Sequence, residues 1–299
     1  MPKQGRREFF KTAGRAGAAL RGSATSSDAS DSGSALSENR FGVLVDTTVC
    51  IGCRQCECAC KVAHHLPGPP AETYEDRSVF ERMRRPDHTA LTVVNEYANP
   101  ANAHLPFNVK VQCMHCDHPA CVSACIVHAL TKQENVAVVW DSSKCIGCRY
   151  CMVACPFQIP AFDYHEALKP DITKCDFCAD RTREGQRPAC VATCPVEALT
   201  YGERHELIKV AHRKIERNPD RYVAHLYGEH EVGGTSWLYL AGRPHAELDF
   251  PVLGSSPAPG VSESIQHGIF KYFIPPVLFY ALLGGFMWVT KNRDEAEAE

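Results

Sequence analysis

The sequence predicts an α+β fold with one membrane-spanning helix near its C-terminus. Three observations support this prediction: short apolar segments precede loops that hold all 17 cysteines, an amphipathic helix follows them, and a long uncharged run comes later. A chain of 299 residues, 44% of them hydrophobic, buries a core without needing disulfides. Its net charge of -3 excludes a generally basic nucleic-acid binder, because phosphate binding draws on many Lys and Arg side chains.

Residues 1–39 are expected to form a leader and a linker ahead of the folded part. The leader contains a basic segment, GRREFFK, from Gly5 to Lys11, and residues 22–37 are rich in Ser, Gly, Ala and Asp. The second segment has no apolar periodicity, which is typical of a linker or a disordered region. The core is therefore predicted to begin at residue 40 and to extend to residue 204.

Within the core, short strands are expected to lead into the cysteine loops. The segments Phe41 to Asp46, Phe107 to Gln112 and Val136 to Asp141 have the composition of strands, and Ala129 to Lys132 is placed to form a hairpin with the last of them. A Pro- and His-containing insertion occupies residues 61–106. Short strands that alternate with cysteine loops and brief helices predict a repeated α+β module of the ferredoxin-like kind.

Residues 205–262 are predicted to form an extension with one helix and one strand. From His205 to Asn218, apolar residues recur on one side and charged residues on the other, and Pro219 ends the helix. The strand is expected at Thr235 to Ala241 (TSWLYLA), after two glycines. Pro, Gly and Ser residues from Pro251 to Ser262 then connect the extension to the last feature of the chain.

That feature is a hydrophobic run of 19 residues without a charge between Lys271 and Lys291. A helix needs about 20 such residues to span a bilayer, so a transmembrane anchor is predicted at residues 263–291, followed by a charged tail at residues 292–299. The alternative is a buried C-terminal core helix. Lys291 and Arg293 favour a cytoplasmic C-terminus, because positive residues are retained on that side of the membrane.

Sixteen of the 17 cysteines fall into four groups of four. The first and third groups have the spacing Cx2Cx2Cx3C, and the second and fourth follow the same plan with a longer loop before their third cysteine. The groups are Cys50, Cys53, Cys56 and Cys60; Cys113, Cys116, Cys121 and Cys125; Cys145, Cys148, Cys151 and Cys155; and Cys175, Cys178, Cys190 and Cys194. Cys58 is the cysteine outside them.

The spacing of these groups favours 4Fe-4S clusters. Three closely spaced thiolates can bind three corners of one iron-sulfur cube, and the fourth cysteine of the run then binds a neighbouring cluster. Structural zinc, in a membrane-anchored scaffold without a redox role, is the alternative. It is disfavoured because zinc sites usually pair two CxxC motifs per ion, whereas the first group places four thiols within eleven residues. Disulfides are disfavoured by the odd number of cysteines and by the length of the chain.

Other polar residues near the cysteines have simpler expected roles. Positive charges beside the clusters would favour the reduced, more negative form of each cluster. The alternative is that these residues are ordinary surface charges. The residues are Arg54, Lys144, Arg149 and Lys174. The histidines of the insertion are expected to be solvated, and they are His64, His65, His88 and His104. No nucleotide-binding, hydrolase or zinc-protease motif occurs in the sequence. We therefore expect the cysteines to be ligands, and we expect no catalytic residue.

Four residues precede the third cysteine of the second group, and eleven residues precede the third cysteine of the fourth group. In this order and spacing the four groups resemble those of the four-cluster iron-sulfur subunit of the dimethyl-sulfoxide-reductase superfamily of membrane oxidoreductases. The resemblance covers residues 41–202 and implies nested pairing, the first group with the fourth and the second with the third. It implies four ligand sets: Cys50, Cys53, Cys56 and Cys194 (set 1); Cys60, Cys175, Cys178 and Cys190 (set 2); Cys113, Cys116, Cys121 and Cys155 (set 3); and Cys125, Cys145, Cys148 and Cys151 (set 4).

Segments after the cysteines are similar to the HybA-type subunit of membrane-bound nickel-iron hydrogenases. They are HLYGE at residues 225–229, GGT at residues 233–235 and SESIQH at residues 262–267. That family also begins with a twin-arginine leader, which GRREFFK resembles, although Arg15 and Arg21 interrupt the apolar segment after it. Iron-sulfur subunits of formate dehydrogenase share the core and are the alternative resemblance. One position departs from the resemblance: Ile126 follows Cys125, where most relatives have proline.

The resemblance implies an electron-transfer subunit with four 4Fe-4S clusters as its cofactors. The expected partners are a catalytic subunit, either a nickel-iron hydrogenase or a molybdopterin enzyme such as formate dehydrogenase, and an integral membrane subunit that reacts with quinone. Membrane lipid would surround the anchor in the inner membrane. The core is expected on the periplasmic side after export in the folded state. His267, beside the span, is a candidate contact at the end of the cluster relay nearest the membrane.

Overall fold

The computed structural model describes residues 40–67, 70–100, 102, 104–165, 171–260, 263 and 274–296. The chain divides into two units, Met1–Ser37 and Glu38–Glu299, and every described residue belongs to the second. The predicted leader and linker, residues 1–39, therefore lie outside the described residues. Residues 264–273, at the start of the predicted anchor, also lie outside them.

A three-stranded sheet with the order β8-β1-β9 joins the beginning of the core to its end. β1 (Phe41–Asp46) runs antiparallel to β8 (Leu199–Glu203) and parallel to β9 (Trp237–Leu240). As the central strand, β1 is buried on both faces, which explains its continuous apolar run and confirms the strand predicted there. β9 lies within the predicted segment Thr235 to Ala241 and is shorter at both ends.

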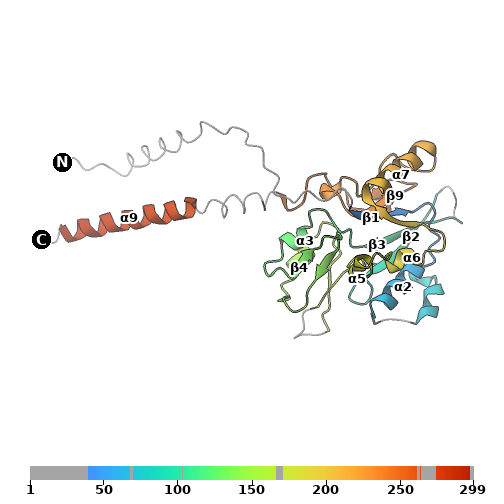
Figure 1. Ribbon diagram of the computed structural model, residues 1–299, viewed down its shortest axis with the longest axis horizontal. Helices are drawn as coiled ribbons and strands as arrows, with labels where there is room; N and C mark the ends of the chain where they lie inside the picture. The colour runs from blue at the N-terminus through green and yellow to red at the C-terminus, as the bar shows by residue number, and fades with distance from the viewer. Residues whose placement is uncertain are drawn as a thin grey trace. The chain divides into compact units, whose positions relative to one another are not determined.

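α7 (Arg204–Arg217) covers one face of this sheet, as Figure 1 shows. Its buried residues Leu207 and Ala211 pack against Leu44 of β1 and Leu238 of β9. The amphipathic pattern located this helix to within one residue at each end, because one apolar stripe meets the sheet. The opposite face of β1 packs against the cysteine-bearing segments.

Three two-stranded antiparallel sheets accompany the cysteine loops. They are β2 (Thr92–Tyr97) with β3 (Phe107–Gln112), β4 (Leu130–Lys132) with β5 (Val138–Trp140), and β6 (Ala161–Phe162) with β7 (Ile172–Thr173). β3 and the β4–β5 hairpin confirm predicted elements, and β5 is shorter than expected at both ends. β2 was not predicted; it lies in the insertion, after two short 3₁₀ helices, η2 (Ala71–Glu75) and η3 (Ser78–Glu81).

Short helices follow the cysteine loops. They are α2 (Gln55–Ala63), α3 (Ala120–Ser123), α4 (Tyr150–Ala154), α5 (Ala179–Arg183) and α6 (Ala189–Ala192). Two 3₁₀ helices flank β9 in the extension, η4 (Glu231–Gly233) and η5 (His245–Leu248). The alternation of brief helices with two-stranded sheets confirms the predicted α+β architecture of ferredoxin-like modules.

α9 (Ile274–Ala296) is the last described helix. Large apolar side chains along it are exposed, among them Leu278, Phe279 and Leu282. Within the described residues, no helix is both long enough and apolar enough to cross a membrane, and the predicted transmembrane helix is therefore not found there.

Candidate iron-sulfur sites

Each cysteine group begins with a CxxC turn of the same backbone shape. The residue before the second cysteine has a positive φ in all four turns: Gly52 (66°), His115 (48°), Gly147 (69°) and Phe177 (62°). This left-handed conformation turns the chain sharply, so that the thiols on either side can face one point. At Gly52 the position requires glycine, because a Cβ would lie 2.3 Å from Oδ1 of Asn108. The same turn therefore opens all four cysteine groups.

The cysteines of set 1 come together around one cavity. Its lining contains Cys50, Cys53, Cys56 and Cys194, with apolar side chains such as Val45, Val94 and Leu199. Burial, together with the charges of Cys194 and Cys53, raises the pKa of the Cys50 thiol to about 11. The first and last cysteine groups of the sequence therefore meet in space.

The cysteines of set 2 line a second cavity. Its lining contains Cys60, Cys175, Cys178 and Cys190, with Phe177 and Trp237. Burial raises the pKa of Cys60 to about 12 and that of Cys178 to about 11, and the charge of Cys190 contributes to both rises. All four cysteines of this set are buried.

The thiols of set 3 lie close to one another, and so do those of set 4. Burial raises the pKa of Cys116 in set 3, and the charges of Cys113, Cys155 and Cys121 add to the rise. Burial raises the pKa of Cys151 in set 4 to about 11, and the charges of Cys148, Cys125 and Cys145 add to the rise. The structure therefore brings together the members of sets 3 and 4, and their role as cluster ligands stays a prediction.

Four thiols around one point fit a 4Fe-4S cluster. As bare thiolates the members of a set would repel one another, and burial would disfavour their charge further, which is why their pKa values rise. A positively charged iron-sulfide core bound by all four thiolates removes both penalties. The donor chemistry of each set therefore suits this cofactor, and the four cysteines of a set would hold it.

Cys58 lies apart from these sets. On α2, residues four positions apart share a face, so Cys56 and Cys60 lie together while Cys58 lies on the other side. Cys58 is also absent from the lining of the set 1 and set 2 cavities. That Cys58 is not a cluster ligand stays a prediction.

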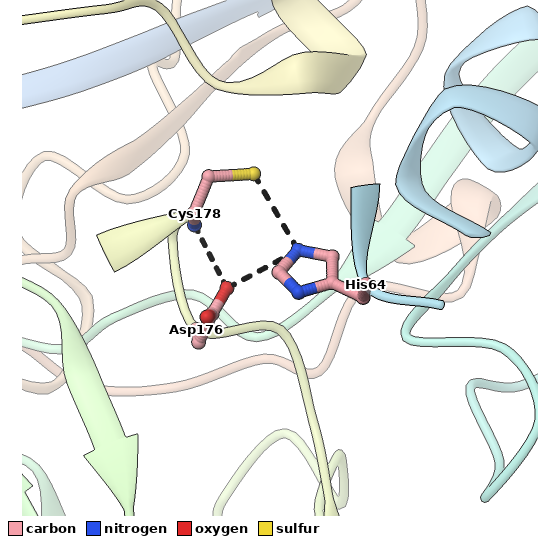
Figure 2. Close-up of side chains that lie close together, drawn as sticks. All are labelled: His64, Asp176 and Cys178. Atoms are coloured by element: carbon pink, nitrogen blue, oxygen red, sulfur yellow. Dashed lines mark hydrogen bonds and ion pairs between the residues drawn. The ribbon is translucent and has the colours of Figure 1, made fainter. Parts of the chain in front are cut away.

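His64, which we expected to be solvated, lies against set 2 instead. Figure 2 shows its ring directed at Cys178 and Asp176, with Nε2 3.5 Å from Sγ of Cys178 and 3.4 Å from Oδ1 of Asp176. The same oxygen of Asp176 accepts a hydrogen bond from the backbone N–H of Cys178 at 2.8 Å. The prediction was wrong because α2 ends at Ala63, and the turn after it carries His64 towards the cysteines.

The four charged residues expected near the clusters occupy different environments. Arg54 and Lys174 are buried, so the surface-charge alternative does not describe them. Lys144 is largely exposed and is paired with a carboxylate, as that alternative expects. The guanidinium of Arg149 lies 5.5 Å from the centre of the Phe162 ring. Proximity in sequence to a cysteine therefore did not decide which charge is buried.

One buried cation was missed by sequence reasoning. Lys110 of β3 is only 2% exposed and lines the cavities of both set 1 and set 2. In the strand FNVKVQ it alternates with apolar residues, which is typical of a solvated strand face. The insertion supplies the neighbouring strand β2 and covers this side chain. Nothing in the sequence around Lys110 predicts that the side chain is buried in this way.

Comparison with known proteins places these sites in a family. The 4Fe-4S dicluster domain matches residues 106–204. The hydrogenase-2 operon protein HybA of Escherichia coli O157:H7 is 33% identical over 96% of this chain and 95% of its own length. The nitrate-inducible formate dehydrogenase iron-sulfur subunit of Escherichia coli K12 is 30% identical over 76% of this chain and 77% of its own. The thiosulfate reductase electron transfer subunit PhsB of Salmonella typhi is 39% identical over 56% of this chain and 78% of its own. The chain therefore belongs to the family of iron-sulfur electron-transfer subunits that includes HybA and the formate dehydrogenase iron-sulfur subunits.

Proposed function

We propose that the chain holds four 4Fe-4S clusters, one in each set, and relays electrons along them in the order of sets 1, 2, 3 and 4. The observation that carries this proposal is the proximity of successive sets. Thiols of neighbouring sets lie close enough for the charge of one to raise the pKa of the other. The pairs are Cys56 with Cys190, Cys175 with Cys113, and Cys121 with Cys151.

The burial of the cysteines supports a relay with two ends. Every cysteine of set 2 is buried, whereas the cysteines of set 1 are half-buried and set 4 contains the exposed Cys148. When bound, each cluster accepts and returns one electron. The protein's part is to exclude water from the middle of the line, to keep neighbouring sites close together, and to leave its ends near the surface for partners.

We propose that one partner is a catalytic subunit of the nickel-iron hydrogenase kind, and that the other is an integral membrane subunit that reacts with quinone. HybA supports this choice, because that relative matches nearly the whole chain and is named as a protein of the hydrogenase-2 operon. A molybdopterin enzyme such as formate dehydrogenase is the second candidate, supported by the iron-sulfur subunits that match about three quarters of the chain.

Isolation of the complex from detergent-solubilised membranes tests the choice of partner. We expect affinity purification of this chain to recover a large subunit that contains nickel, measured by metal analysis of the purified complex. Molybdenum or tungsten in place of nickel would support the second candidate. Recovery of the chain with a full complement of iron but with neither class of enzyme would contradict both assignments.

We further propose that residues 263–291 anchor the chain in the inner membrane, with the core on the periplasmic side and the C-terminus in the cytoplasm. The uncharged run between Lys271 and Lys291 and the exposed apolar side chains of α9 support this. We expect the full chain to stay with membranes after alkaline washing and a chain ending at residue 262 to be released. Equal release of both would contradict the anchor.

A further inference from the structure

Lys110 occupies the wall between the first two sites. It lies on β3, and its side chain contributes to the lining of both the set 1 and the set 2 cavities. Cys50 and Cys56 line the set 1 cavity with it, and Cys60 and Cys175 line the set 2 cavity with it. One ammonium group therefore faces two neighbouring ligand sets.

The hydrogen bonds of this ammonium group all go to neutral partners. Nζ donates to Oγ1 of Thr92 at 2.7 Å and to Oε1 of Gln112 at 3.0 Å, and it lies 4.6 Å from the centre of the Trp237 ring. A buried ammonium group is costly unless a negative charge lies nearby. Neutral partners fix the position of the group without cancelling its charge.

The groups around Lys110 that can carry negative charge are the cysteines of the two cavities. Its side chain lines the set 1 cavity together with Cys56 and the set 2 cavity together with Cys175 and Cys190. Clusters bound by these thiolates would supply the negative charge that compensates the buried ammonium group.

A rigid network holds the lysine in place. Nε2 of Gln112 donates to the hydroxyl of Tyr239 at 2.6 Å, and that hydroxyl donates to the backbone carbonyl of Lys110 at 2.8 Å. Tyr239 is 1% exposed and Gln112 is equally buried. The network connects β3 to the central sheet through β9, so the ammonium group cannot readily swing away from the two cavities.

We propose that Lys110 is a positioning residue that acts as a shared counter-charge for the first two sites and raises the reduction potentials of both. The inference rests on the proposed function, since it requires clusters in sets 1 and 2. A reduced cluster carries one more negative charge than an oxidised one, so a fixed cation nearby stabilises the reduced form. Because one cation serves both sites, the two potentials are raised together, and the difference between them changes little.

Redox titration followed by electron paramagnetic resonance tests this inference on the purified full-length chain. Lys110→Met keeps the length of the side chain and removes its charge. We expect two of the four midpoint potentials to fall, each by at least a tenfold change in the ratio of reduced to oxidised cluster at a fixed potential, or about 59 mV. The two shifted signals should be those that disappear in Cys53→Ser and in Cys178→Ser, which identify sites 1 and 2.

Lys132→Met is the matched control. Lys132 is also partly buried beside a cluster site, donating to the carbonyl of Cys116 in set 3 at 2.7 Å, but its charge is paired with Asp117. It should leave the potentials of sites 1 and 2 unchanged. An unshifted Lys110→Met, or an equal shift at all four sites, would contradict the inference while leaving the relay intact.

Lys110→Arg is the control for the case in which the Lys110→Met chain does not bind its clusters. If Lys110→Met loses its clusters while Lys110→Arg keeps them, the charge is what matters and the inference is supported. Loss in both variants would show that the shape of the site, and not its charge, is the requirement, and would overturn it. Absence of clusters from the wild-type chain would instead refute the proposed function itself.

Discussion

Cys148→Ser is expected to remove or alter one of four cluster signals and to stop electron transfer through the chain. Cys148 belongs to set 4, where Cys125, Cys145 and Cys151 are its neighbours. A serine hydroxyl is a far poorer iron ligand than a thiolate, so site 4 should lose its cluster or hold it in a changed form. Because set 4 is at one end of the proposed line, its loss removes an exit or an entry for electrons.

The measurement combines spectroscopy with turnover. Electron paramagnetic resonance of the reduced Cys148→Ser chain should lack or change one signal and keep the other three. Electron transfer from the catalytic partner to a quinone analogue through the complex should fall to background. A spectrum identical to that of the wild type would contradict the assignment of Cys148 as a ligand.

Cys58→Ser is the matched control for this experiment. It makes the same chemical change in another cysteine group, but Cys58 lies on α2 on the opposite side of the helix from Cys56 and Cys60. We expect all four signals and the rate of electron transfer to be retained. Loss of a cluster in Cys58→Ser would show that the cysteine register of the first group has been assigned incorrectly.

Glu57→Ala is expected to cause the largest loss of stability among single substitutions of charged residues. The Glu57 side chain is 4% exposed on α2, between the two cysteines Cys56 and Cys60. It binds Arg84 through two hydrogen bonds of 2.6 Å and 3.1 Å and pairs with the buried Arg54 at 3.2 Å. Removing one partner of such a buried ion cluster typically costs about 3 to 5 kcal/mol, because the arginines are left uncompensated.

Glu57 also fixes the insertion to the cluster-bearing helix. It accepts a hydrogen bond from the backbone N–H of Val94 in β2 at 2.6 Å. The Glu57→Ala chain should therefore unfold at a lower denaturant concentration and should release iron faster from sites 1 and 2 than from sites 3 and 4. Denaturant titration and timed chelation of iron measure the two effects. Glu206→Ala, on the exposed side of α7, is the control and should behave like the wild type.

The strands, helices and buried charges of the core show how far the sequence could predict the fold. β1 and α7 were predicted closely, because burial of a central strand and of one helix face leaves a clear local pattern. β2 was missed although TVVNEY favours a strand, because its partner β3 lies beyond an irregular stretch of the insertion. Glu57 and Lys110 have sequence neighbours that are typical of solvated faces, and only tertiary cover buries them.

The candidate sites, like the fold, could be predicted only where the local sequence determines them. Local spacing identified four groups of ligands, but the exchange of cysteines between groups depends on contacts between distant segments, such as Cys194 with Cys50. That pairing came from the family resemblance and not from spacing. The contact of His64 with Cys178 and the position of Lys110 between two cavities had no sequence signal at all, since both depend on how the insertion packs.

The iron and acid-labile sulfide content of the anaerobically purified and reconstituted chain tests the central claim most directly. Four filled sites with four irons each predict about sixteen iron atoms and about sixteen sulfides per chain, in a brown protein. Far fewer irons after reconstitution, or a colourless protein that contains zinc, would contradict the proposal that this chain is a relay of four clusters.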